Sequence, residues 1–523
     1  MQNLESALSA WRDILGAEHV ITDEAALQVA ETATFPTTSR VPAIIRPGNR
    51  AEVQACVRIA NEYKVPIYPI SKGKNWGYGS AVPVSDGCAI MALERLNRIV
   101  EFDEELAYVT IEPGVTQVQL FEFLRSKDSN LFASMTSSSP DSSLIGNTIE
   151  RGLGSGPYGD RFAHVCGLEV VLPTGECIHT GFDRFANAKS ARVNRWGVGP
   201  YVDGIFTQSN LGIVTQMTMW LNPYPEYLQL ILFSVDEDKL EETIDSLRML
   251  RLAGVINASL TLVNDYKAFM SLIPQYPWQE VDNQTPLPTD YFETWKKTYG
   301  VSKWFATIDL FSASKEQGHA QRKLIHQTLK PHVNYMLFVD RHSTLQLGPF
   351  TAWNHEKEYV GIPWERGVAP TYWRKKMPIP DTLDPDRDRC GVVWCAPSTP
   401  FRGKEVNKML QIVEDSFKNY EFEPYLTLIA NTERNINLIM AIFYDRDVPG
   451  EDERALAWHD EIFHKLTEGG YFPYRLGIRD MNALPPVKDD YGEFISRLKK
   501  ALDPNNILAP GRYDFRTEWP ENP

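Results

Sequence analysis

The chain has 523 residues, of which 43% are hydrophobic and 23% charged, and its formal net charge is −15. These values are typical of a globular protein long enough for two or more domains. The acidic balance argues against nucleic acid or an anionic membrane as the main partner, because both require a basic surface. The six cysteines form no CxxC pair, which favours reduced thiols and a cytoplasmic location.

The first 225 residues alternate short apolar runs with helical patterns. The chain begins with an expected amphipathic helix rather than a signal peptide or a membrane span, and its apolar face holds Leu4, Leu8, Trp11 and Leu15. Strands are predicted at 41–47, 65–71, 88–93 and 107–114, and helices at 51–63 and 117–126. Thr116 and Gln119 form a plausible capping box for the second of these helices. Residues 168–178 are typical of a hairpin.

From residue 226 onward, longer amphipathic helices alternate with strands. Helices are predicted at 236–251, 314–330, 402–419 and 451–468, and strands at 305–311, 335–340, 392–398 and 437–445. The proline-rich stretches 275–295 and 375–390 are interpreted as excursions. This pattern indicates an α+β fold with helices on an antiparallel sheet. We therefore predict two domains, 1–225 and 226–464, followed by a tail, 465–523.

Four segments rich in glycine or small polar residues are spread along the chain: 71–80 (SKGKNWGYGS), 146–162 (GNTIERGLGSGPYGDRF), 203–215 (DGIFTQSNLGIVT) and 509–513 (APGRY). Glycine loops can present backbone N–H groups to a phosphate, although the spacing here fits neither G-x-G-x-x-G nor a Walker loop. Taken singly, each segment is equally well explained as an ordinary turn. Taken together, they favour one extended ligand held by several loops.

These segments, with "VTIEPGVT", "CGLEVVLPTGE" and "DPNNILAPGR", resemble the vanillyl-alcohol oxidase/p-cresol methylhydroxylase family of flavoproteins, and in particular its 4-phenol-oxidising branch. The resemblance implies an FAD-binding domain formed by residues 1–225 and the returning tail, and a substrate domain that caps the isoalloxazine ring. It implies a pyrophosphate loop at 71–79, with Ser71, Gly73, Lys74, Asn75 and Gly77 as donors and with glycines beside Tyr78 that clear space for the flavin. The remaining implied cofactor contacts are Gly146, Asn147 and Thr148 along the flavin, Ile213 near the adenine, and Arg512 near flavin N1 and C2=O.

The resemblance also implies the chemistry. Tyr78, Tyr474 and Arg475 would hold a 4-alkylphenol as its phenolate, and a hydride would pass from the benzylic carbon to flavin N5, leaving a p-quinone methide. A phenol has a pKa of ~10, so its anion needs roughly 4 kcal/mol of stabilisation at neutral pH. Glu150 stands where the family has an acidic residue, usually aspartate, and would act as a base or a charge stabiliser. Outside this family context, the Tyr–Arg pair and Glu150 would be read as ordinary surface residues.

Several positions depart from the family pattern. The residues that bind FAD covalently in some relatives correspond to Val392 and Asp384, so we expect a dissociable FAD. Ser155 and Gly156 replace bulkier residues, and Asn437 and Leu438 replace two histidines, which suggests a different phenol. No metal site is expected.

The fate of the quinone methide stays open among hydration, desaturation and, for a larger 4-hydroxyphenyl carboxylate, decarboxylation. Oxygen is the favoured electron acceptor, because the chain has no CxxCH motif for a haem. The expected partners are a small phenol and O2, without nucleic acid or membrane, and a homodimer is left open. Two alternatives are a flavin-binding protein without catalysis and an oxidase of sugars or other alcohols.

Overall fold

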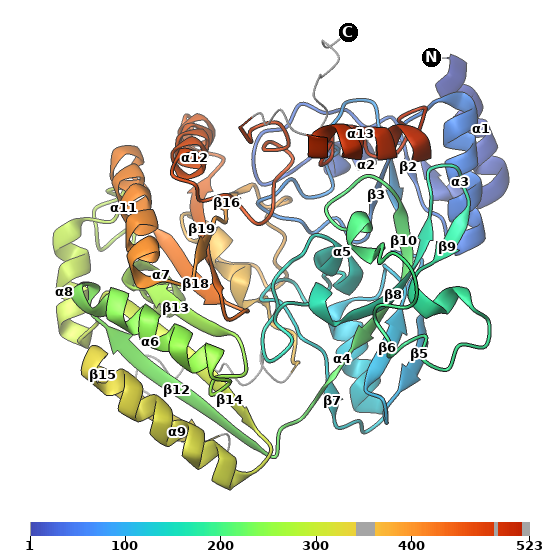
Figure 1. Cartoon of the computed structure of the whole chain (residues 1–523). Helices are drawn as coiled ribbons and strands as arrows, with labels where there is room; N and C mark the ends of the chain where they lie inside the picture. The colour runs from blue at the N-terminus through green and yellow to red at the C-terminus, as the bar shows by residue number, and fades with distance from the viewer. Residues whose placement is uncertain (1, 341–360, 486–489, 515–523) are drawn as a thin grey trace.

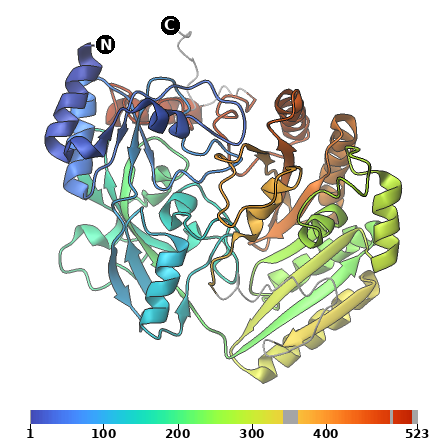
Figure 2. The same ribbon diagram turned by 180° about the vertical axis from the view of Figure 1, so that it is seen from behind.

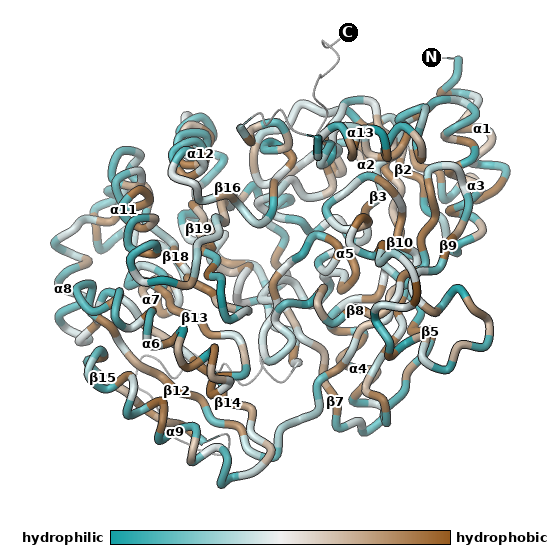
Figure 3. Tube along the Cα trace, in the orientation of Figure 1, coloured by the Kyte–Doolittle hydropathy of each residue, from teal (hydrophilic) through white to brown (hydrophobic). Residues whose placement is uncertain are grey.

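The computed structural model describes residues 2–340, 361–485 and 490–514 (Figure 1). Its strands form two main antiparallel sheets, a smaller mixed sheet near the N-terminus and one two-stranded antiparallel pair. Figure 3 shows hydrophobic residues concentrated along the strands, with polar residues on the outer helices. None of the helices in the described ranges combines the length and the apolar character needed to cross a bilayer.

The N-terminal sheet has the order β1-β2-β4-β3, with parallel pairs β2/β4 and β3/β4. Helix α1 has its predicted apolar face buried, and the indole Nε1 of Trp11 donates to the Cys56 carbonyl at 3.2 Å. Helix α3 begins after Asn49, whose side chain accepts from the Glu52 amide. The predicted strand at 41–47 is reduced to two residues. The elements of this layer are α1 (Gln2–Leu15), β1 (Val20–Ile21), α2 (Glu24–Ala30), β2 (Ile44–Ile45), α3 (Arg50–Tyr63), β3 (Ile67–Ile70) and β4 (Ala89–Ala92).

A five-stranded sheet of order β5-β6-β10-β8-β9 follows, and it contains the predicted hairpin as β8 and β9. The Thr116 side chain caps α4 as predicted, but the Gln119 side chain donates to the Asn97 carbonyl instead of completing the box. The elements are β5 (Ile99–Asp103), β6 (Tyr108–Ile111), α4 (Gln117–Ser126), β7 (Leu131–Phe132), α5 (Leu144–Ile149), β8 (Val165–Val171), β9 (Cys177–His179), β10 (Ile213–Trp220) and β11 (Asn222–Pro223).

The second half forms an eight-stranded antiparallel sheet of order β15-β12-β14-β13-β18-β19-β16, with β17 paired to β19. The predicted helices and strands are confirmed, whereas β12, β13, α7, β18 and the helix α8, which begins inside the expected 275–295 excursion, were missed. The elements are β12 (Tyr227–Val235), α6 (Leu240–Leu252), β13 (Leu260–Asn264), α7 (Asp265–Leu272), α8 (Thr289–Tyr299), β14 (Trp304–Ser312), α9 (Lys315–Leu329), β15 (Tyr335–Asp340), β16 (Cys390–Cys395), β17 (Ser398–Pro400), α11 (Gly403–Tyr420), β18 (Tyr425–Ala430), β19 (Asn435–Asp445) and α12 (Glu451–Glu468).

The two faces of this sheet have different environments because side chains alternate along a strand. Leu260 and Leu262 of β13, like Leu426 and Leu428 of β18, join the core beneath the helices α6, α9, α11 and α12. The alternate residues of the same two strands line a cavity on the opposite face. They are Thr261 and Val263 in β13 and Tyr425, Thr427 and Ile429 in β18. The sheet therefore has one helix-covered face and one face that is available for a ligand.

The C-terminal segment returns to the N-terminal sheet. Helix α13 (Asp490–Leu502) lies beside the first elements of the chain in both views (Figures 1 and 2). The Ile67 amide donates to the Ile507 carbonyl at 2.7 Å, and the Ala509 amide donates to the Ile67 carbonyl at 2.8 Å. These bonds extend β3 with the tail and carry residues 509–513 to the cavity. Residues 515–523 of the predicted C-terminal segment lie outside the described residues.

Candidate active site

A cavity of about 490 Å³ lies between the N-terminal sheets and the open face of the eight-stranded sheet. One wall comes from residues 68–80, the loops at 135–155 and 209–214, and the tail. The other wall comes from β13, α7, β16, β18 and β19. Of the residues predicted from the sequence to form the site, those that line it are Ser71, Gly73, Lys74, Asn75, Tyr78, Gly146, Asn147, Glu150, Ile213, Tyr474, Arg475 and Arg512.

The glycine loop has the properties of an anion cradle. The backbone amides of residues 73–76 donate to no other group in the described parts of the chain. Adjacent amides of this kind, in a turn opened by Gly73 at φ +69°, suit a phosphate. The Lys74 ammonium contacts Ser139 Oγ at 3.0 Å and Asp141 Oδ2 at 3.4 Å. These donors, most of which are backbone amides, therefore fit a pyrophosphate.

Gly77 and Gly79 do not serve the purpose expected from the sequence. At φ +80°, a Cβ on Gly77 would lie 1.9 Å from Cδ1 of Trp394, and a Cβ on Gly79 would meet Ile478. Gly77 does not line the cavity. These glycines therefore let the loop pack closely against the cap strand β16 and the C-terminal segment, and the clearance is for protein side chains.

Helix α5 brings two of its three predicted cofactor contacts to the cavity. Ser143 caps this helix, and a Cβ on Gly146 would lie 3.2 Å from Ser71 Oγ, so the helix and the glycine loop are in close contact. Thr148 is fully buried and its hydroxyl donates to the Leu144 carbonyl at 2.8 Å. Because that hydroxyl faces its own helix, Thr148 does not line the cavity as expected.

Tyr78, Tyr474 and Arg475 all line the cavity and lie close together, although almost 400 positions separate Tyr78 from the other two in the chain. The Arg475 Cζ lies 4.3 Å from the centre of the Tyr78 ring, and Arg475 Nη2 donates to Asn75 Oδ1. Desolvation raises the pKa of both tyrosines, so each hydroxyl stays protonated and can donate. Desolvation alone would lower the pKa of Arg475, but the charge of Glu150 and the tyrosines raise it.

The backbone of this cluster is held from several directions. The Tyr474 amide donates to the Ala396 carbonyl at 3.1 Å, and the Ile478 amide donates to the Tyr78 carbonyl at 2.9 Å. The Gln208 amide group donates to the carbonyls of both Glu150 and Tyr474, at 3.1 and 2.9 Å. Gln208 was not predicted from the sequence, although it lies in the third small-residue segment, 203–215.

Glu150 is an ionised carboxylate between two arginines. It forms an ion pair with Arg512, and the two side chains are 14% and 12% exposed. The Tyr513 hydroxyl donates to its second oxygen at 3.2 Å. Burial raises the pKa of Glu150, but Arg512 and Arg475 outweigh burial and leave it below the ordinary value. A carboxylate of this kind is a poor proton acceptor, so the geometry favours charge stabilisation over general-base catalysis.

The positions linked to covalent flavin attachment lie outside the cavity. Val392 is fully buried in β16, and neither it nor Asp384 lines the cavity. No histidine or cysteine is among the lining residues in the described ranges. Asn437 and Leu438 do not line it either, because Asn437 bonds Ser398 and Leu438 faces the helix-covered core. Ser155 does line the cavity, as the altered-pocket interpretation requires.

Three further residues at the site were missed by the sequence reading. Trp394 of β16 and Lys267 of α7 line the cavity from the cap side. Arg161 is 2% exposed and donates from Nη1 to Asn147 Oδ1 at 2.8 Å. It therefore fixes the orientation of the Asn147 side chain, which lines the cavity. Only Arg161 had a signal, since it belongs to the glycine-rich segment 146–162.

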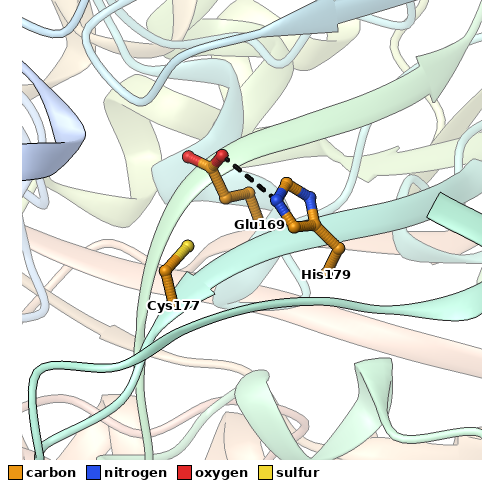
Figure 4. A group of neighbouring side chains, drawn as sticks. All are labelled: Glu169, Cys177 and His179. Atoms are coloured by element: carbon orange, nitrogen blue, oxygen red, sulfur yellow. Dashed lines mark ion pairs between the residues drawn. The ribbon is translucent and has the colours of Figure 1, made fainter. Parts of the chain in front are cut away.

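A group of possible metal ligands lies away from this cavity, on β8 and β9. The ligand atoms of Glu169, Cys177 and His179 are within 4.8 Å of one another (Figure 4). The Glu169 carboxylate already accepts from Arg50 at 2.9 Å and from Thr215 at 2.7 Å. Because the Arg50 cation occupies the carboxylate, this group is better explained as an ion-pair network.

Comparisons with known proteins agree with the geometry. Residues 41–181 match the FAD binding domain family. The chain is 49% identical to 1'-carboxy-chondrochloren decarboxylase of Chondromyces crocatus over 99% of both chains. It is 29% identical to the flavoprotein subunit of 4-cresol dehydrogenase [hydroxylating] of Pseudomonas putida, covering 97% of this chain and 94% of the other. Among solved structures, substrate-bound p-cresol methylhydroxylase and 4-ethylphenol oxidase from Gulosibacter chungangensis each align with a TM-score of 0.89, at 27% and 26% identity, over 99% of this chain and 98% of theirs.

Proposed function

Since the chain belongs to the vanillyl-alcohol oxidase/p-cresol methylhydroxylase family of FAD-dependent enzymes, we propose that it oxidises a para-substituted phenol with loss of CO2. The observation that carries the phenol is the convergence of Tyr78, Tyr474 and Arg475 in the lining of the cavity. The decarboxylation is supported by the 49% identity, over the whole length, to a relative named as a decarboxylase.

The charges at the site favour an anionic substrate. Arg475 and Arg512 are cations and Glu150 is an anion, so together they leave an excess positive charge. Two protonated tyrosine hydroxyls add donors beside Arg475. Hydrogen bonds to an ionised acceptor contribute about 1.5–3 kcal/mol each, so this donor set can supply the roughly 4 kcal/mol that a bound phenolate needs.

FAD, held by the glycine loop and Arg512, would supply the acceptor for a hydride from the benzylic carbon of the substrate. The donors of the tyrosine–arginine cluster hold the phenolate whose electrons move toward the para carbon, and the substrate becomes a p-quinone methide. If the next carbon carries a carboxylate, its C–C bond breaks, CO2 leaves, and the electron pair forms the alkene and restores the phenolate. The Glu150–Arg512 pair keeps these charges fixed at the site.

Three finer points belong to the same proposal. The FAD is dissociable, which is supported by Val392 and Asp384 at the positions of covalent attachment, because neither side chain can form that bond. O2 is the electron acceptor, and a measurement of oxygen consumption during turnover tests this assignment. A homodimer stays a prediction, and light scattering by the purified protein tests it.

The test is anaerobic mixing of the purified protein with a panel of 4-substituted phenols, including 3-(4-hydroxyphenyl) acids. We expect the flavin absorbance to bleach and the product of an acid to lose both two hydrogens and CO2 by mass spectrometry. A product that lacks only two hydrogens would indicate desaturation, and one that gains oxygen would indicate hydration. If no phenol bleaches the flavin, the proposed function is wrong.

A further inference from the structure

A cationic side chain faces the cavity from the cap wall, across from the flavin-binding loops. Lys267 of α7 lines the cavity together with Thr261, Val263, Thr427 and Ile429. Its Nζ donates to Thr427 Oγ1 at 2.6 Å and lies 4.5 Å from the centre of the Tyr425 ring. The proposed function assigns nothing to this lysine.

Hydrogen bonds from the Asn264 side chain fix the position of Lys267. The Asn264 side chain caps α7 by accepting from the Lys267 amide at 3.1 Å. The same side chain accepts from the Leu426 amide at 3.2 Å and donates to the Pro424 carbonyl at 2.8 Å. One buried asparagine therefore joins the first turn of α7 to the beginning of β18, and Lys267 and Thr427 are held side by side.

Aromatic side chains connect this lysine with the phenol-binding cluster. The Trp394 amide donates to the Gly77 carbonyl at 3.3 Å, next to Tyr78. The Trp394 and Tyr425 rings lie 6.3 Å apart between centres, and Lys267 stands over the face of Tyr425. Trp394 and Tyr425 thus form an aromatic wall of the cavity, and their contacts link the backbone next to Tyr78 with the Lys267 ammonium.

We propose that Lys267 and Thr427 bind the carboxylate of a 4-hydroxyphenyl acid whose phenolate lies against Tyr78, Tyr474 and Arg475. This inference rests on the proposed function and adds the residues that select an acid over a neutral phenol. An ammonium and a hydroxyl donor together match the two oxygens of a carboxylate. The aromatic wall between them suits the ring and the carbon chain of the substrate.

This assignment separates binding from chemistry. Lys267 contacts the carboxylate before hydride transfer, and the contact ends when the C–C bond breaks and CO2 leaves. Because an ammonium stabilises the carboxylate in the ground state, it strengthens binding of the acid and does not accelerate loss of CO2. The lysine should therefore affect KM for acids, with little effect on kcat.

The experiment compares 3-(4-hydroxyphenyl)propanoate with its neutral amide, which has nearly the same size. For each compound, binding to the FAD-loaded protein is measured by calorimetry and flavin reduction by anaerobic stopped flow. We expect Lys267→Met to weaken binding of the acid by about 10- to 100-fold and to leave the amide within about twofold. Lys267→Arg, which retains the charge, should recover part of the preference. The control is Lys408→Met, because Lys408 is 52% exposed on α11 and pairs with Glu405.

The possible results decide between the two proposals. Equal weakening of acid and amide, or no change for either, would overturn the role of Lys267 while leaving phenol oxidation intact. Failure of the amide and the acid to reduce the flavin in the unmodified protein would overturn the proposed function and this inference together. If Lys267→Met does not retain FAD, Thr427→Val replaces it, with several-fold weaker binding of the acid alone as the expected result.

Discussion

Replacing Tyr474 with Phe tests the phenolate mechanism most directly. The substitution removes one hydroxyl and retains the ring, and the backbone bond from the Tyr474 amide to Ala396 is unaffected. The pKa of Tyr474 is raised by desolvation, so the hydroxyl is a donor in the unmodified protein. FAD should stay bound, because this side chain is at the phenol end and the glycine loop is not changed.

The expected size of the effect follows from the donor set. A donor to an ionised oxygen contributes about 1.5–3 kcal/mol, which is roughly a 10- to 100-fold slower flavin reduction at neutral pH. The pKa of the bound phenol should rise by about 1–2 units. The deficit should therefore shrink as the pH rises and the phenol ionises in solution.

The assay is anaerobic stopped-flow reduction by 4-ethylphenol, measured from neutral to alkaline pH for both proteins. Tyr471→Phe is the matched control, because Tyr471 lies on the same segment, bonds Glu405 at 3.3 Å and does not line the cavity. Unchanged reduction rates in Tyr474→Phe, or a deficit independent of pH, would refute the reasoning.

Three further predictions concern the cofactor and the packing around it. Acid precipitation should leave the yellow colour in the supernatant, and a coloured pellet would show covalent FAD. Gly77→Ala should lower the free energy of unfolding by at least ~2 kcal/mol, because its Cβ would lie 1.9 Å from Trp394. Thermal unfolding measures this loss of stability, and an unchanged Tm would contradict the close packing of Gly77 against Trp394. Asp386 accepts from Trp76 and Ser80, and burial raises its pKa from 3.8 to about 7. The unfolded chain therefore loses this proton at a lower pH than the folded chain. The free energy of unfolding should fall by up to ~4 kcal/mol as the pH rises from 3.8 to about 7. Asp386→Asn should remove this part of the pH dependence in denaturant titrations.

Much of the architecture could be predicted from local pattern. The 3.6-residue periodicity placed α1, α3, α11 and α12, and the apolar runs placed β14, β15 and β19, because these elements bury one face against a core. The strands β13 and β18 were missed. Both strands are short, with five and six residues, and a threonine that faces the cavity, Thr261 or Thr427, interrupts each apolar run.

The candidate site shows the same division. The residue types of the glycine loop, of Tyr474–Arg475 and of Arg512 were readable, because each belongs to a short segment with a recognisable composition. Which partner each one meets was not readable. Glu150 pairs with Arg512 across more than 300 positions, and Gly77 accommodates Trp394 rather than a cofactor.

The sequence by itself determined the family and the FAD cofactor, and it supplied the residue types of the proposed phenol site, since these depend on short segments whose chemistry is local. Only the tertiary structure decided that Thr148 faces its own helix, that Glu150 is held ionised between arginines, and that Lys267 lines the cavity beside Tyr425. The physical reason is that burial, charge pairing and close packing depend on contacts between distant segments, which local composition does not encode.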